Sequence, residues 1–328
     1  MVPRLSNGVD TPLFEIKQIP RKGRGLVARI NVATGTRILC EKPLLTVQSE
    51  YTTPVDAENM FAAQLKALPK ASQREFLSLH NTNPGKYPFT GIVRTNALPC
   101  GPSSSVGAVY PTICLINHSC VPNCNHSWNS DTGRETIHAI RPIEAGEEIT
   151  IAYDCGRVSA VRRAFLKVNF GFDCICRACS LPAAELAASD ARRERIQALD
   201  DAIGDASRMA SRPSDCLRDC HALLQALRKE YDGCTVVLSA RAYYDAFQIC
   251  IAHGDEARAS VFAERAYKIR VICEGEDSLE TQRMLSFARN PASHPTFGIC
   301  SFGWKRSRAM VPKGLDAEQF EEWLFKMK

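Results

Sequence analysis

The sequence lacks any apolar run near the ~18–20 residues that a membrane-spanning helix needs. Residues 1–10 also lack the basic start and the apolar stretch of a secretory signal. The excess of positive over negative charge is small, a net charge of +5 over 328 residues. A charge of this size does not indicate a nucleic-acid-binding surface. We therefore expect a protein of the nucleus or cytoplasm that does not bind membranes and for which direct binding of nucleic acid is not indicated. We also expect a monomer.

The composition is that of a globular protein. Hydrophobic residues make up 45% and charged residues 23% of the chain, so it can bury a substantial core. A length of 328 residues predicts one large domain or two of medium size.

Hydrophobic periodicity divides the chain into a β-rich first half and a helical second half. The predicted segments are strands at 13–47 and 113–155, a helical stretch at 55–80, a proline-rich loop at 81–112, and a short helix at Ser159–Asn169. From residue 183 onward the spacing is almost entirely helical. Paired helices of this size suggest a small tetratricopeptide-like array, although no strict repeat is visible.

Fifteen cysteines are many for a reducing compartment, and their odd number argues against a disulfide framework. Three of them form the cluster Cys174-x-Cys176-x-x-Cys179, a spacing typical of a site in which thiolates bind zinc tetrahedrally. A closed structural site needs a fourth ligand, and spacing alone does not choose among the other cysteines. Coincidental clustering and a redox pair are the alternatives.

Three further motifs are weaker when each is taken alone. Asn117-His118-Ser119-Cys120 concentrates polar groups in four residues, but an Asn-His pair is usually structural. Lys22-Gly23-Arg24-Gly25 is either a tight turn or a place where the backbone approaches a ligand closely. Tyr153 ends an alternating strand, Ile149 to Tyr153, where a half-buried structural tyrosine is the simpler interpretation.

Taken together and in this order, the motifs resemble the SET-domain lysine methyltransferases, and most of all the branch of SET-and-MYND proteins and their fungal relatives. The resemblance rests on four motifs in this order: the Gly-x-Gly turn at 23–25, Asn-His-Ser-Cys at 117–120, Gly-Glu-Glu-Ile-Thr-Ile-Ala-Tyr at 146–153 and Gly-Phe-x-Cys-x-Cys-x-x-Cys at 171–179. The resemblance covers about residues 13–180, and the helical tail also resembles the C-terminal region of that branch. The MYND zinc finger of that branch is absent. Its place in the chain, residues 48–112, has Cys100 as its single cysteine, which is too few ligands for a paired zinc site.

The resemblance implies an α+β fold. Its parts are a SET domain of small sheets at 13–155, a helical and loop insert at about 48–112, a zinc-binding post-SET segment at 156–182 and a C-terminal helical domain at 183–328. Segments of the core are expected to thread through one another as a pseudoknot.

The resemblance also implies roles for individual residues. It places Gly23, Arg24 and Gly25 beside S-adenosylmethionine and gives the cofactor contacts to Asn117 and His118. Tyr153 becomes the catalytic residue, lining the methyl-transfer channel and touching the cofactor, and Phe172 packs on the adenine or closes the lysine channel. Cys120 becomes the fourth zinc ligand, with Cys174, Cys176 and Cys179.

The implied activity is protein-lysine N-methylation, with S-adenosylmethionine as cosubstrate and Zn²⁺ in a structural role. The partner is then a protein or peptide that bears lysine, either a histone or a non-histone protein. The alternative is a catalytically silent scaffold that has the SET fold with its zinc site and binds protein partners through its helices. The presence of Tyr153, Asn117 and His118 favours the enzyme.

Overall fold

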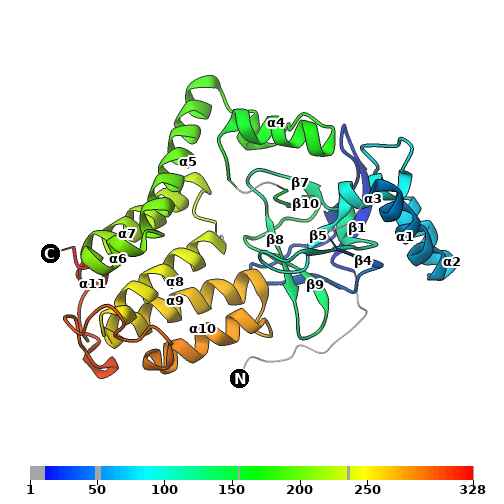
Figure 1. Ribbon diagram of the computed structural model, residues 1–328. Helices are drawn as coiled ribbons and strands as arrows, with labels where there is room; N and C mark the ends of the chain where they lie inside the picture. Colours follow the sequence, from blue (N-terminus) through cyan, green and yellow to red (C-terminus); the bar gives the residue numbers. More distant parts are fainter. Residues whose placement is uncertain (1–11, 49–52, 154–155, 235–236, 328) are drawn as a thin grey trace.

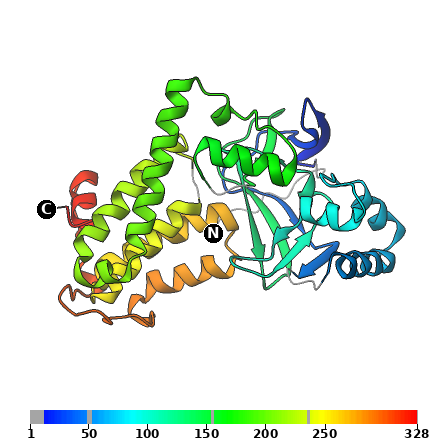
Figure 2. The ribbon, with the colours of Figure 1, turned by 45° about the horizontal axis from the view of Figure 1, so that its top comes forward.

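The computed structural model describes residues 12–48, 53–153, 156–234 and 237–327. Strands and a small group of helices form one part of the molecule, and long helices form the other (Figure 1). The same division is visible after rotation (Figure 2), with helix α4 (Ser159–Phe170) beside the sheets and α5 (Ala183–Ile203) leading into the helical part. None of the helices in the described ranges is long and apolar enough to cross a membrane.

Within the described residues the strands form small sheets, and the first has the order β1-β2-β10-β7. Its strands are β1 (Phe14–Ile19), β2 (Gly23–Ala28), β7 (Asn117–His118) and β10 (Glu148–Ile151). β10 pairs antiparallel with β2 and parallel with β7, so Thr150 lies opposite Asn117. This pairing brings two motifs that are far apart in the sequence to one sheet.

Two other sheets complete the β part. One has the order β3-β9-β8, and its strands are β3 (Arg37–Glu41), β8 (Cys124–Asn129) and β9 (Arg134–Ala139). The other has the order β4-β6-β5, and its strands are β4 (Leu45–Gln48), β5 (Leu98–Pro99) and β6 (Val106–Val109). Leu26 and Ile149 of the first sheet and Ile137 of the sheet β3-β9-β8 are fully buried in one hydrophobic cluster. Small sheets around a shared core agree with the expected fold class, whereas the pseudoknot stays a prediction.

The insert is more regular than the sequence suggested. It contains α1 (Pro54–Ala67), α2 (Lys70–Leu77) and α3 (Pro88–Asn96), so the predicted loop at 81–112 is wrong for α3, β5 and β6. Proline suits the first turn of a helix, where its missing N–H is not needed. The Glu58 carboxylate then accepts from the backbone N–H groups of Phe89 at 3.0 Å and Thr90 at 2.8 Å. A cap supplied by a distant helix leaves no local sequence signal.

Helices fill the second half of the chain, as predicted. They continue with α6 (Ala206–Ser211), α7 (Pro213–Glu230), α8 (Val237–Ala252), α9 (Glu256–Glu274), α10 (Leu279–Arg289) and α11 (Ala317–Leu324). Short 3-10 turns lie at Ile113–Leu115, Arg177–Cys179, Pro291–Ser293 and Arg308–Met310. α5 packs on α7, α7 on α8, α8 on α9 and α9 on α10, around the buried rings of Phe247 and Phe262.

A polar contact joins α9 and the turn that follows it to the sheet β3-β9-β8. Asn125 donates to the Cys273 carbonyl at 3.0 Å, and Asn129 donates to the Asp277 carbonyl at 3.0 Å. Arg37 pairs with the Asp277 carboxylate and donates to His138 Nε2 at 3.1 Å. Burial, together with the Arg37 charge, lowers the pKa of His138 to about 4, which keeps this imidazole a neutral acceptor.

Replacing Gly275 by alanine should weaken this contact. Gly275 has φ +89°, and an added Cβ would lie 2.5 Å from Arg37 Nη2 and 3.0 Å from His138 Nε2. We expect Gly275→Ala to lower the free energy of unfolding, measured in urea, by roughly 2–4 kcal/mol. Gly146→Ala is the matched control, since it has the same φ of +89° and no neighbour within 4 Å. Equal losses in the two variants would show that the crowding costs nothing.

Candidate functional site

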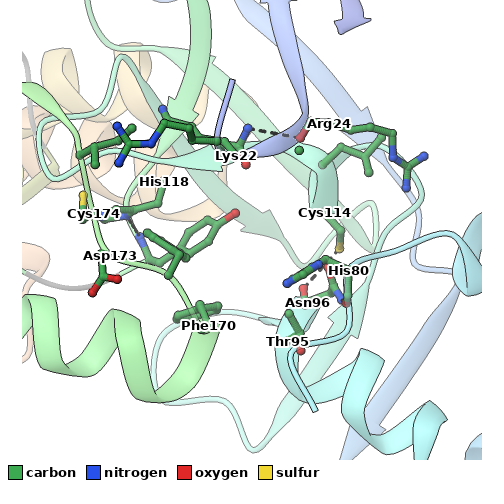
Figure 3. Close-up of a pocket in the computed structure, with 18 of the residues that line it drawn as sticks. Lys22, Arg24, His80, Thr95, Asn96, Cys114, His118, Phe170, Asp173 and Cys174 are labelled. Atoms are coloured by element: carbon green, nitrogen blue, oxygen red, sulfur yellow. Dashed lines mark hydrogen bonds between the residues drawn. The ribbon is translucent and has the colours of Figure 1, made fainter. Parts of the chain in front are cut away.

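A cavity of about 480 Å³ lies where three parts of the chain meet (Figure 3). Lys22 from the β1–β2 turn and Arg24 from β2 lie on one side, and Thr95 and Asn96 from α3 on another. The segment 170–176, which begins with the last residue of α4, forms a further side. Of the cofactor residues predicted from the sequence, this cavity is lined by Gly23, Arg24, Asn117, His118, Tyr153 and Phe172.

Gly25 is the exception, because it does not line the cavity. A Cβ added there would lie 2.6 Å from Asn117 Nδ2 and 2.7 Å from Ile19 Cγ1. The glycine therefore allows the Asn117 side chain to approach the β2 backbone, where it donates to the Arg24 carbonyl at 3.2 Å. Gly23 acts differently: it has φ +79° and nothing within 4 Å of an added Cβ, so it serves the turn itself.

Glu148 is a site residue that the sequence reasoning missed. Its Oε1 accepts from Asn117 Nδ2 at 2.9 Å, and its Oε2 pairs with Lys22 Nζ at 2.6 Å. Glu148 thereby fixes both the Asn117 amide and the Lys22 ammonium at the edge of the cavity. The signal was available, since Glu148 is the last residue of the Gly-Glu-Glu motif and the first residue of β10.

His118 links Tyr153 to the cysteine cluster. Its Nδ1 accepts from the Tyr153 backbone N–H at 3.0 Å. A neutral imidazole then carries its proton on Nε2, which lies 3.2 Å from the Cys120 sulfur and donates to it. A donor directed at sulfur favours the thiolate, which is the form that binds metals.

The four predicted zinc ligands lie together and are all buried. The sulfurs of Cys120, Cys174, Cys176 and Cys179 are within 4.8 Å of one another, and Cys120 lies 3.6 Å from Cys179 and 4.0 Å from Cys174. Tetrahedral ligands at about 2.3 Å from zinc are about 3.8 Å apart, so the group fits this ion.

Tyr153 stands just beyond β10, which ends at Ile151 rather than at the tyrosine itself. Its hydroxyl donates to the Ile116 carbonyl at 2.5 Å, and burial raises its pKa well above the usual value, so the proton stays on the phenol. The Phe170 ring lies 4.8 Å from the Tyr153 ring, centroid to centroid. Phe170 was missed from the sequence, although it lies two positions before the predicted Phe172.

A second cavity, of about 120 Å³, lies behind Tyr153. Tyr153 and Phe170 line both cavities, as do Cys114, Thr95 and Asn96. The smaller cavity is otherwise mostly apolar, with Leu98, Ile116 and Ile151 among its walls. The tyrosine therefore stands between a large, polar-edged cavity and a narrow apolar one.

Known proteins resemble this chain in both sequence and domain content. Residues 23–154 match the family model described as SET domain. The chain is 33% identical over 296 residues to "Histone-lysine N-methyltransferase set5" of Schizosaccharomyces pombe, which covers 88% of this chain and 87% of that protein. It is 43% identical over 72 residues to "Histone-lysine N-methyltransferase SMYD3" of Homo sapiens, which covers 22% of this chain and 16% of that protein. A solved structure, "Crystal structure of the SET domain of LSMT bound to Lysine and AdoHcy", covers 96% of this chain and 95% of that one at 13% identity and a TM-score of 0.36.

The geometry of the cysteine cluster predicts about one tightly held zinc ion per chain. Cys176→Ala should lose the ion and lower the melting temperature, because a structural zinc contributes folding free energy directly. Cys40→Ala is the control, since Cys40 is exposed and outside the cluster. Elemental analysis of the purified, folded protein checks the prediction, and a protein that folds without zinc would contradict it.

Crowding at Gly25 gives a second prediction for this site. Gly25→Val should displace the Asn117 amide and weaken binding of S-adenosylmethionine about 10-fold or more, as should Asn117→Ala, which removes the amide. Gly85→Val is the control, because nothing lies within 4 Å of a Cβ added at Gly85. Calorimetry that finds unchanged affinity in both site variants would mean that the cofactor binds elsewhere.

Proposed function

Since this chain belongs to the SET-domain family, we propose that it is a protein-lysine N-methyltransferase that uses S-adenosylmethionine. One observation carries the proposal: two cavities of different character meet at Tyr153. Methyl transfer from sulfur to an amine is an in-line displacement, so the donor and the amine must approach the methyl carbon from opposite sides. Two chambers that share a wall containing Tyr153 suit that requirement.

The larger cavity suits the cofactor. S-adenosylmethionine supplies a methyl group activated by its sulfonium, and the chain has to bind and align it. Arg21, Lys22 and Arg24 offer positive charge to the cofactor's carboxylate. Phe172, which also lines this cavity, offers a ring face to the adenine.

The smaller cavity suits the lysine side chain. Its walls include Leu98, Ile116 and Phe170, which would pack against the methylene stem of the lysine and exclude water. Loss of water disfavours the charged ammonium and so promotes the neutral amine, which is the nucleophile. The amine nitrogen would then arrive beside Tyr153 in a dry channel, where its alignment lowers the barrier.

Tyr153 is proposed as the residue that orients the amine. Its proton is committed to the Ile116 carbonyl, which leaves the lone pairs of the phenol oxygen as acceptors. An amine N–H that donates to this oxygen would turn its own lone pair toward the methyl group. The backbone of Tyr153 is fixed by His118, so the zinc-binding segment and the reacting groups share one support.

The substrate is a protein that bears lysine, and we propose a histone. Support comes from the relatives in Schizosaccharomyces pombe and Homo sapiens, which are named histone-lysine N-methyltransferases. Action on a histone would place the protein in the nucleus. A monomeric state and protein partners for the helical domain stay predictions.

Tyr153→Phe tests the proposed chemistry most directly. The change removes one oxygen and keeps the ring, so packing should hardly change. We expect transfer of a labelled methyl group from S-adenosylmethionine to core histones, or to proteins of a cell extract, to fall by roughly 10²-fold or more. Cofactor affinity should stay nearly constant.

Tyr267→Phe is the matched control, because Tyr267 lies on α9, away from both cavities. Full turnover by Tyr153→Phe would show that the hydroxyl takes no part in the reaction. A wild-type chain that transfers no methyl group, while still binding the cofactor, would favour the scaffold alternative.

A further inference from the structure

A histidine–carboxylate pair forms part of the wall of the smaller cavity and has no role in the mechanism so far. His126 on β8 lines this cavity. Its Nδ1 lies 2.9 Å from Glu135 Oε1 on the neighbouring strand β9. The Glu135 side chain is 0% exposed and the His126 side chain 29% exposed, so the pair extends from the core to solvent.

Both oxygens of Glu135 have donors. Besides His126 at Oε1, the Tyr110 hydroxyl lies 3.5 Å from Oε2. Burial, and then the Glu135 charge, raise the pKa of Tyr110 well above its usual value, so Tyr110 remains a donor. A buried carboxylate with donors on both sides can stay ionised.

The carboxylate also fixes the tautomer of the imidazole. An ionised Glu135 accepts, so His126 Nδ1 carries the proton and Nε2 keeps its lone pair. Among the residues that the structure describes, none forms a hydrogen bond with Nε2. A buried carboxylate that orients an imidazole in this way is the arrangement of a general base.

The other titratable groups of this cavity are unsuited to accept a proton. Of the described lining residues, Cys114, His126 and Tyr153 can titrate. Burial raises the pKa of Cys114 to about 12 and that of Tyr153 further, so both stay protonated near neutral pH. Cys100, which lies next to Tyr110, also has its pKa raised by burial. His126 Nε2, which keeps its lone pair, is the remaining proton acceptor among these side chains.

We propose that His126 accepts the proton that the substrate lysine must lose, and that Glu135 is its positioning residue. This inference rests on the proposed methyl transfer. A lysine ammonium has a reference pKa near 10.4, so at neutral pH it enters the cavity charged. Its N–H bond breaks, the proton goes to Nε2, and the imidazolium is stabilised by the Glu135 carboxylate. The freed lone pair forms the N–C bond as the methyl–sulfur bond breaks, and His126 returns the proton to solvent at its exposed edge.

The test compares the full-length wild type with His126→Gln, using labelled S-adenosylmethionine and core histones or a cell extract, from pH 7 to pH 10. Near pH 7 we expect kcat to fall by about 10²-fold with KM little changed. The difference in kcat between His126→Gln and the wild type should shrink toward pH 10, where about one-third of the lysine is neutral even without a base. Affinity for S-adenosylmethionine should stay constant. Glu135→Gln should act in the same direction with a smaller loss.

Ser127→Ala is the matched control, because successive strand residues point to opposite faces and Ser127 therefore points away from His126. His126→Phe, which keeps the bulk of the ring, is the second variant if His126→Gln folds poorly, and it should show the same pH pattern. A loss that is equal at every pH, or no loss, would overturn the role of His126 while leaving the proposed function intact. A wild-type chain without methyl transfer would overturn both.

Discussion

The hydrogen bonds of His118 connect the cysteine cluster to the place where the cavities meet. One ring nitrogen accepts from the Tyr153 backbone, and the other donates to the Cys120 sulfur. The same cluster holds Cys174 and Cys176, which line the larger cavity together with Phe172. If the cluster opens, the cofactor wall and the support of Tyr153 are lost together. The zinc site can therefore be structural in kind and still determine activity.

Electrostatics divides the two cavities as clearly as their sizes do. The larger one has the cations of Arg21, Lys22 and Arg24 at its edge, and the smaller one is mostly apolar apart from the His126 wall. A cofactor with a carboxylate suits the first environment, and the stem of a lysine suits the second. Loss of water from the apolar channel favours the neutral, reactive amine. It also removes the water that would accept the proton of the lysine ammonium. A base in the cavity wall can accept that proton instead.

The sequence predicted the parts of the site that are made by short motifs. The three-cysteine spacing and the Asn-His motif were readable because each is local, and the resemblance joined them. Glu148 lies in a motif that the sequence shows, but its contacts, like those of Phe170 and His126, depend on strand pairing and on the end of α4, which the sequence does not show. The helix α3 was missed for the same reason, since the cap of its first turn comes from Glu58, far away in the sequence.

Strand β8 gives the helical half of the chain a physical connection to the site. Alternation along the strand sends Asn125 and Asn129 toward α9 and the turn after it, where they donate to backbone carbonyls. His126, between them, faces the smaller cavity on the other side of the sheet. A shift of the helices against β8 would therefore move the imidazole relative to the lysine channel.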